Sequence, residues 1–428
     1  MGAFTTLVVL LLAAAPAQEP PRPAPTPPSS CLQCHAELGG SAAEPVALLG
    51  EDIHGQKGLS CHDCHGGNPA AGHDGDIDAA HDVAKGWREK PTRLQVPQFC
   101  ARCHADAEYM KRFNPHTRID QLGEYRTSVH GKKNAAGDTR TAVCVDCHGV
   151  HGIRAVSDAR SSVHPTRLAD TCARCHTDAK LMDQYGLPTV QYADYKTSVH
   201  AHALYEKGDL GAPTCNDCHG SHGAVPPGVG SVANVCGSCH GREASLFRET
   251  EKKKGLDLDL CIQCMVCHDN HAVKAPTADM LGVGPRSTCI GCHSPGDRQY
   301  AAAERMGAGL QRLRTGLEDA HGLLARAERA GMEVSEDQFA LQKAQDQVVE
   351  ARVLVHSFDE ERFQASVAEG TGVVEAGLTA GRRAFRELRE RRLGLGVSLI
   401  VIVAVIAGLV LKVREIEATP PDARSGAD

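Results

Sequence analysis

The chain has 428 residues and a formal net charge of −7, and only 4% of its residues are aromatic. A chain so poor in large apolar side chains is not expected to build a large globular core from its own side chains. The acidic balance, and the lack of a basic patch with interleaved aromatic residues, argue against a nucleic-acid partner.

The N-terminus is predicted to direct export. Residues 1–17 have the length and apolar centre of a signal peptide, and Ala15-Pro16-Ala17 offers a small-residue cleavage site. The apolar run is not preceded by Lys or Arg, which departs from the usual pattern. Residues 18–30 contain six prolines and are predicted to form an extended linker.

One pattern, Cys-x-x-Cys-His, then occurs nine times and takes up all but one of the 19 cysteines. It is the attachment signature for c-type haem, because its two thiols reach the vinyl groups of one porphyrin and its histidine becomes the proximal iron ligand. We therefore expect nine c-type haems, whose iron-bearing rings also supply missing apolar mass. The predicted attachment residues are Cys31, Cys34, Cys61, Cys64, Cys100, Cys103, Cys144, Cys147, Cys172, Cys175, Cys215, Cys218, Cys236, Cys239, Cys264, Cys267, Cys289 and Cys292. The predicted proximal ligands are His35, His65, His104, His148, His176, His219, His240, His268 and His293.

Three other readings of paired cysteines fit the sequence poorly. Zinc ribbons and disulfide scaffolds do not need a histidine after every pair. A thioredoxin-like redox motif occurs once, beside a βαβ pattern. Haem attachment takes place outside the cytoplasmic membrane, which agrees with an exported chain.

The haem region repeats itself with an offset of about 71 residues. Residues 98–152 contain EYRTSVHG between two motifs, and residues 170–223 contain DYKTSVHA in the same place. A degenerate first copy has EDIHG, and a shorter third copy runs from Cys236 to Ala272. Residues 31–296 are thus predicted to form a nonahaem domain of overlapping two-haem repeats, mostly irregular and short-helical with little strand.

These paired motifs, the Ser-Val-His before the second of them and the His-Gly after it resemble multihaem cytochromes of the doubled-CXXCH and class III cytochrome c type. The resemblance covers about residues 31–293. It implies an electron carrier or conduit with bis-histidine haems. Some related multihaem proteins are enzymes that act on nitrogen or sulfur oxyanions at one open haem.

Nine bis-histidine haems also need distal ligands. The sequence offers 14 further histidines. His202 is expected to be secondary to His200, and His321 and His356 are expected to be surface or packing residues. The candidates at repeated positions are His54, His130, His151, His200, His222 and His271, and the others are His62, His73, His81, His116 and His164.

The third repeat lacks a Ser-Val-His between Cys239 and Cys264. The haem at Cys264 and Cys267 is therefore predicted to borrow a distant ligand, use another residue type or stay open. The unpaired Cys261 lies in this stretch. It is open to four interpretations: a thiolate ligand, a free thiol, an alternative attachment point or a residue without function.

The motifs favour an electron-transfer protein over an enzyme. All nine end in histidine, whereas an ammonia-forming nitrite reductase would have lysine in that place. Seven tyrosines are available for the cross-link of a hydroxylamine-oxidising haem, but no pattern selects one. The alternatives are an oxidoreductase with one open haem and a haem-bearing subunit of a larger respiratory complex.

Residues 297–392 are predicted to form a helical hairpin or three-helix stalk. Gly331 is expected to end its first helix, and Ser335 with Gln338 to begin the second through a capping box. A third helix is expected from near Asp359, with weak breaks at Gly370, Gly372 and Gly377. The stripe that indicates the first helix is Leu310, Leu313, Leu317, Ala320, Leu324 and Ala327.

Residues 393–411 are apolar and uncharged over a length that can span a bilayer. We expect the haem domain on the periplasmic side of the cytoplasmic membrane and residues 412–428 in the cytoplasm. The arginines before the span oppose the positive-inside rule, which long translocated domains override. The expected partners are a membrane quinol-oxidising complex and a periplasmic or outer acceptor, and no oligomeric state is predicted.

Overall fold

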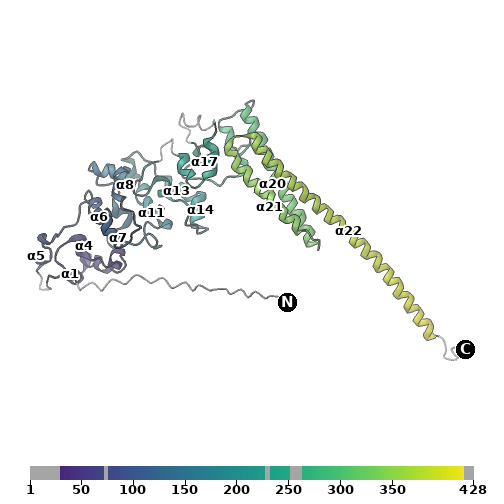
Figure 1. Ribbon diagram of the computed structural model, residues 1–428, viewed down its shortest axis with the longest axis horizontal. Coiled ribbons are helices and arrows are strands. Elements are labelled where there is room, and N and C mark those ends of the chain that lie inside the picture. Colours follow the sequence, from purple (N-terminus) through teal and green to yellow (C-terminus); the bar gives the residue numbers. More distant parts are fainter. Residues whose placement is uncertain (1–28, 72–75, 227–231, 251–262, 419–428) are drawn as a thin grey trace, which may run out of the picture. The chain divides into compact units, whose positions relative to one another are not determined.

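A computed structural model describes residues 29–71, 76–226, 232–250 and 263–418 (Figure 1). Over these ranges the chain forms helices and irregular segments and no strand, which confirms the helical and irregular fold class. The chain divides into two compact units, Met1–Pro226 and Pro227–Asp428. The predicted signal peptide, almost all of the linker, His73 and Cys261 lie outside the described residues.

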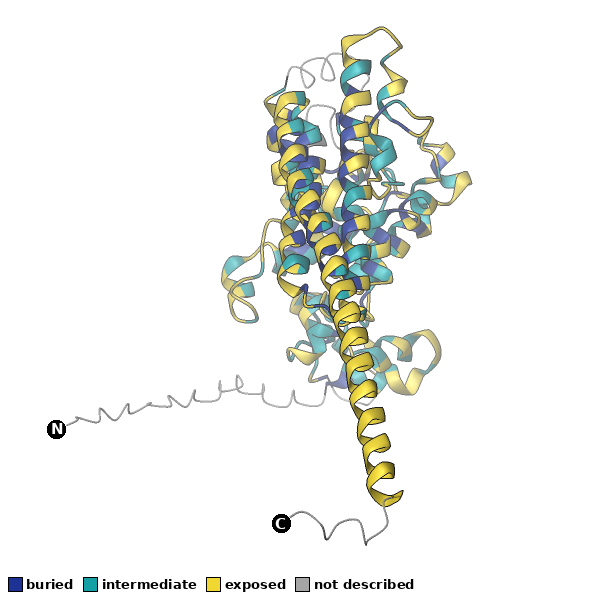
Figure 2. Cartoon of the chain, turned by 90° about the vertical axis from the view of Figure 1, so that its right-hand side faces the viewer, coloured by how far each residue is buried: buried dark blue, intermediate teal, exposed yellow. Residues whose placement is uncertain are grey.

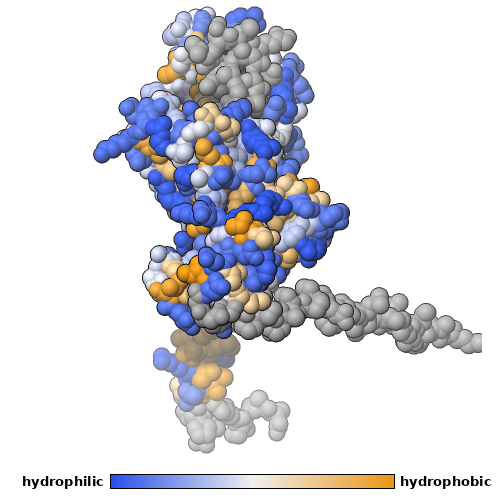
Figure 3. Space-filling view, turned by 90° about the vertical axis from the view of Figure 1, so that its left-hand side faces the viewer, coloured by the Kyte–Doolittle hydropathy of each residue, from blue (hydrophilic) through white to orange (hydrophobic). Residues whose placement is uncertain are grey.

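The first unit holds six of the nine motifs on short helices. Its clustered apolar core is small and consists of Ala169, Tyr195 and Ala201. Figure 3 shows a face on which hydrophilic side chains dominate and small apolar patches are scattered. The helices are α1 Ser30–Leu38, α2 Gly40–Leu48, α3 Ile53–Gln56, α4 Cys61–His65, α5 Ile77–Ala80, η1 Val83–Lys85, α6 Val96–His104, α7 Ala107–Lys111, α8 Gln121–Thr127, α9 Val129–Ala135, α10 Cys144–His148, α11 Pro165–His176, α12 Ala179–Asp183, α13 Gln191–Lys196, α14 Val199–Tyr205 and α15 Cys215–His219.

The second unit holds the other three motifs and three long helices that pack together. The predicted stripe of the first long helix is buried in full, against Leu341 and Phe363 of the other two (Figure 2). This core carries most of the buried apolar surface of the described chain. The helices are α16 Val232–Gly237, α17 Gly241–Arg248, α19 Met265–His268, η3 Ala278–Met280, η4 Cys289–Gly291, α20 Arg298–Arg329, α21 Ser335–Leu354, η5 Val355–Ser357 and α22 Glu360–Ala418.

Two details of this bundle differ from the expectation. Ser335 does not cap α21 with Gln338, because its hydroxyl donates to Glu333 and the N-cap residue is Val334. The glycines do not break the third helix either. A Cβ at Gly370 would lie 2.9 Å from the Cβ of Gln347, and one at Gly377 would lie 2.8 Å from Leu341. These two glycines therefore let α22 pack closely on its neighbours.

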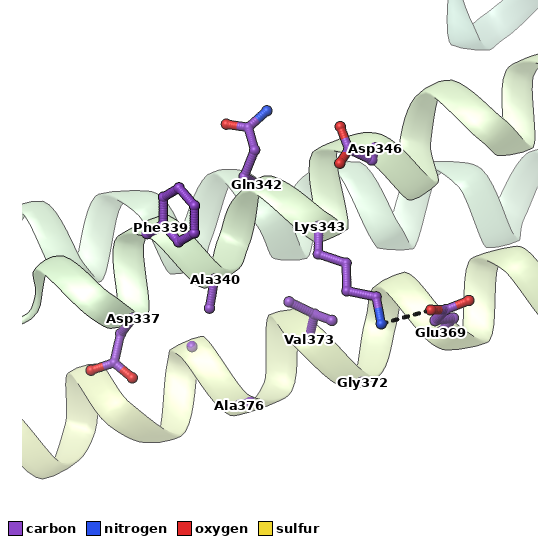
Figure 4. A pocket seen from close by; sticks show the side chains of 11 residues that line it. Asp337, Phe339, Ala340, Gln342, Lys343, Asp346, Glu369, Gly372, Val373 and Ala376 are labelled. Atoms are coloured by element: carbon purple, nitrogen blue, oxygen red, sulfur yellow. Dashed lines mark ion pairs between the residues drawn. The ribbon is translucent and has the colours of Figure 1, made fainter. Parts of the chain in front are cut away.

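Helix α22 continues for 59 residues and includes the apolar run 393–411. It is the one helix of the described chain that is long and apolar enough to cross a membrane, and its most apolar window is fully exposed. An open groove of about 670 Å³ lies between α21 and the part of α22 that precedes the apolar run, beside the ion pair of Lys343 and Glu369 (Figure 4). No histidine or cysteine lines this groove, so it is not a haem site.

Candidate haem-binding site

The even-numbered motifs of the first unit share one local structure. Each has the form Cys-x-Asp-Cys-His and folds into a single helical turn, α4, α10 or α15. The aspartate accepts a hydrogen bond of 2.7 Å from the backbone N–H of the residue before the motif, which satisfies an orphan donor of the helix start. The glycine that follows has a positive φ and ends the turn at the proximal histidine.

The third and fifth motifs lie instead at the C-terminal ends of longer helices, α6 and α11, and the first motif begins near the start of α1. In the third and fifth motifs, an arginine between the two cysteines reaches the backbone of the preceding motif. Arg102 donates to the carbonyl of Cys64 at 2.5 Å, and Arg174 donates to the carbonyl of Asp146 at 2.5 Å. Each of these motifs is thereby tied to the one before it.

Consecutive motifs also lie close together through their cysteines, in alternation. Where an odd-numbered motif is followed by an even-numbered one, the first cysteine of each motif lies near the first cysteine of the other. Where an even-numbered motif is followed by an odd-numbered one, the second cysteine of the even-numbered motif lies near the cysteines of the next motif. The first kind joins Cys31 with Cys61, Cys100 with Cys144, Cys172 with Cys215 and Cys236 with Cys264. The second kind joins Cys64 with Cys103, Cys147 with Cys175 and Cys267 with Cys289. Motifs one to six, and motifs seven to nine, therefore follow one another in space as in sequence.

Five ring pairs in the described part of the chain each join a motif histidine to a second histidine at a nearly constant distance. A metal–imidazole bond is about 2.0 Å long and the ring centroid lies about 1.1 Å behind the ligating nitrogen, so two rings on one iron have centroids about 6.2 Å apart. The observed separations, 5.9 to 6.4 Å, match this value. The pairs are His35 with His81, His104 with His54, His176 with His130, His148 with His222, and His268 with His356.

The repeated segments position these second histidines. His130 is the second residue of α9, whose N-cap Ser128 is fully buried and accepts the N–H of Gly131 at 2.8 Å. The N–H of Val129 donates to the carbonyl of Ala224 at 3.1 Å, which docks the segment after His222 onto α9.

The degenerate first repeat is built in the same way. Asp52 caps α3 and accepts the N–H of His54 at 2.8 Å. The N–H of Ile53 donates to the carbonyl of Ile153 at 2.7 Å, so the segment after His151 docks onto α3. His54 and His130 are therefore equivalent, as the repeat predicts, and each belongs to a pair of docked segments.

Burial favours the neutral form of seven histidines in and around these pairs, and the neutral imidazole is the form that binds a metal. It lowers the pKa of these seven rings, because a charged ring loses its hydration inside the protein. In some rings a hydrogen bond at Nδ1 leaves Nε2 available to iron. Nδ1 of His65 lies 3.4 Å from the carbonyl oxygen of Arg88, and Nδ1 of His54 lies 2.9 Å from a carboxylate oxygen of Asp52. The histidines with lowered pKa values are His65, His104, His130, His148, His176, His222 and His268.

The remaining predicted distal candidates lie at the following places. His151 lies near His65 and interacts with it electrostatically. His200 holds the same place in α14 as His130 in α9, and His271 follows the eighth motif at the offset of His151. His62 has a buried Nδ1 without a hydrogen-bond partner among the described residues.

Two candidates have positions that suit structure better than iron. His164 is the N-cap of α11, and its Nδ1 accepts the N–H of Thr166 at 3.3 Å. His116 is exposed. His81, in contrast, lies against both His35 and the indole of Trp87, whose centroid is 4.0 Å away. Trp87 also approaches His65 and is an apolar wall beside the first two motifs.

Comparisons with known proteins agree with this geometry. Residues 15–66, which include the first two motifs, match the family described as Cytochrome c554 and c-prime. The multiheme cytochrome MtrA of Shewanella baltica is 25% identical over 223 residues, which cover 49% of this chain and 52% of that protein. The chain thus spans about half the length of this curated relative, and no solved structure matches it. Both matches support a multihaem c-type cytochrome.

Proposed function

We propose that this multihaem cytochrome carries nine haems, one per motif, and conducts electrons along them. The observation that carries the proposal is the alternating approach of consecutive motifs, which would bring the haems of motifs one to six, and those of motifs seven to nine, beside one another in order. When bound, each haem supplies an iron that gains and loses one electron.

The histidine pairs support bis-histidine ligation, which leaves no position for a substrate. We assign His81, His54, His222 and His130 as partners of the motif histidines that they face, and His151 as the partner of His65. The chain fixes several of these rings through helix caps and Nδ1 hydrogen bonds. Such ligation suits a carrier better than an enzyme.

Residues 393–411 would anchor the chain in the cytoplasmic membrane, with all nine motifs outside and the C-terminal tail inside. The exposure of this run on the helix and its lack of charged residues support this role. The conduit would then accept electrons from a membrane quinol-oxidising complex and deliver them to a periplasmic or outer acceptor.

Two measurements test the proposal. The mass of the intact purified protein should correspond to nine covalent haems, and a smaller number would reject the count. The current through single molecules held between electrodes should fall sharply when Cys144 and Cys147 become serine, because the fourth haem lies inside the chain. Loss of the first haem through Cys31→Ser and Cys34→Ser is the matched control and should leave most of the current. Equal currents in the two variants would reject a sequential conduit.

A further inference from the structure

His356 was expected to be an ordinary residue of the helical region, but its ring faces a motif histidine. The centroids of His356 and His268 are 6.1 Å apart and their planes differ by 18°, a geometry like that of the pairs in the first unit. Nδ1 of His356 donates to the carbonyl of Val353 at 2.9 Å, so Nε2 keeps its lone pair for a metal.

The surrounding helices hold this ring in place. His356 lies on η5, between Leu354, which is buried, and Phe358, which is exposed. Phe358 has a φ of 53° and turns the chain into α22. Helix α17, which follows the seventh motif, packs here through Phe247 against Phe358, with ring centroids 6.4 Å apart. Arg242 of the same helix pairs with Glu350 of α21 at 2.6 Å.

The repeat also explains why the eighth motif needs a ligand from outside the motif region. His65 of motif two lies near His151, which follows motif four, and His148 of motif four faces His222, which follows motif six. The second histidine of an even-numbered motif thus comes from the segment that follows the next even-numbered motif. The sequence has no tenth motif, so motif eight has no such source.

We propose that His356 is the sixth ligand of the haem at Cys264 and Cys267. The inference rests on the proposed haem binding. The three-helix bundle would then be a part of a haem site as well as a support, and folding of α21 would complete the eighth haem.

A second inference follows from the odd motifs. His104 of motif three and His176 of motif five face His54 and His130, each of which lies just before the intervening even motif. For motif nine the equivalent stretch is residues 241–263, which contain no histidine. The missing Ser-Val-His therefore leaves the ninth haem without a histidine from this stretch, and the eighth haem would take the distant ligand that was one of its predicted alternatives.

Other histidines of the second unit are placed for other roles. His356 faces His268, and His271 holds the position that serves even motifs. His321 is exposed and lies about 35 Å along α20 from the helix start that follows motif nine. We infer from the missing histidine that the haem at Cys289 and Cys292 would keep a sixth position without a histidine, available to a small neutral ligand of ferrous iron.

Carbon monoxide binding to the reduced full-length protein tests both inferences. The wild type should bind carbon monoxide at the ninth haem, and His356→Ala should bind one molecule more per chain than the wild type, with one additional high-spin haem in electron paramagnetic resonance. His321→Ala, the other histidine of the bundle, should match the wild type. No binding to the wild type would overturn the open ninth haem, and an unchanged stoichiometry in His356→Ala would overturn the role of His356.

A second variant separates ligation from folding. His356→Met should keep the haem low-spin and raise the potential of one haem, because thioether ligation favours ferrous iron. A merely structural histidine would change neither spin state nor potential. A haem count by mass, run on every variant, distinguishes these outcomes from failure of the haem-binding proposal itself.

Discussion

Nδ1 of His54 lies 2.9 Å from one carboxylate oxygen of Asp52, and the other oxygen accepts the backbone N–H of Ile153 at 2.9 Å. Asp52 is 5% exposed. One buried carboxylate therefore orients the ring proposed for the third haem and fastens the segment that carries His151, the ring proposed for the second.

We expect Asp52→Asn to raise the potential of one haem by on the order of 50 mV, about a tenfold shift in its redox equilibrium. The carboxylate increases the basicity of the His54 ring and so stabilises ferric iron. Spectroelectrochemical titration would measure the shift. Asp106→Asn is the control, since Asp106 also caps a helix but accepts from Tyr109 N–H. Identical titration curves for both variants would contradict the role of Asp52.

Glycines of α22 should respond to alanine with opposite signs. A Cβ at Gly370 would lie 2.9 to 3.0 Å from Gln347 and Leu313, whereas nothing lies within 4 Å of one at Gly372. Gly372→Ala should raise the free energy of unfolding by up to about 1 kcal/mol through helix propensity. Gly370→Ala should lose that gain to overpacking and fall below the wild type. Circular dichroism during urea unfolding would measure both, and equal stabilisation would show that the contact is not tight.

A chain that ends after Arg392 should be released from the membrane with its haems. The buried contacts of α22 end at Ala384, so the bundle stays complete without the apolar run. Fractionation and haem staining would locate the protein. Removal of residues 419–428 alone is the control and should leave it in the membrane. Retention of the shorter chain in the membrane fraction would argue against residues 393–411 as the anchor.

Acid should weaken one tie within the first unit. The hydroxyl of Tyr185 donates to Asp138 at 2.7 Å, and hydrogen bonds from the backbone of Arg140 and from Tyr185 lower the pKa of Asp138 to about 2. The stabilisation is therefore complete above the ordinary carboxyl pKa of about 4 and is lost as pH falls through about 2.

Asp138→Asn should consequently flatten the fall in unfolding free energy between pH 4 and pH 2. Denaturation at a series of pH values would show this. Glu108→Gln, which changes an exposed carboxylate, should keep the slope of the wild type. A slope unchanged by Asp138→Asn would mean that this hydrogen bond does not contribute.

Local patterns in the sequence predicted much of the fold. The spacing of Leu310, Leu313 and Leu317 indicates the buried face of α20, because three- and four-residue steps lie on one side of a helix. The predicted helix break at Gly377 was wrong, because close packing on Leu341 outweighs the low helix propensity of glycine. That packing depends on a helix that is distant in sequence. The motif histidines are local features, whereas the facing ring of His104 comes from a segment that is distant in sequence.

The repeats in the sequence do not predict the position of His356. It belongs to no repeat, so its type and spacing carry no signal by themselves. A signal did exist in the order of the motifs, since the last even motif has no later one behind it to supply a ring. Only the packing of α17 and η5, which the sequence does not encode in a short pattern, brings His356 to His268.

Helix α22 begins four residues after His356 and reaches the apolar run at residue 393. Thirty-odd residues of unbroken helix amount to about 50 Å. With residues 393–411 in a bilayer and the helix upright, the eighth haem would be carried at that height, beyond the reach of any quinol dissolved among the lipids. Electrons that pass through it would have to be exchanged with a protein that extends equally far from the membrane. The length of α22 would therefore determine which partner proteins can reach the eighth haem.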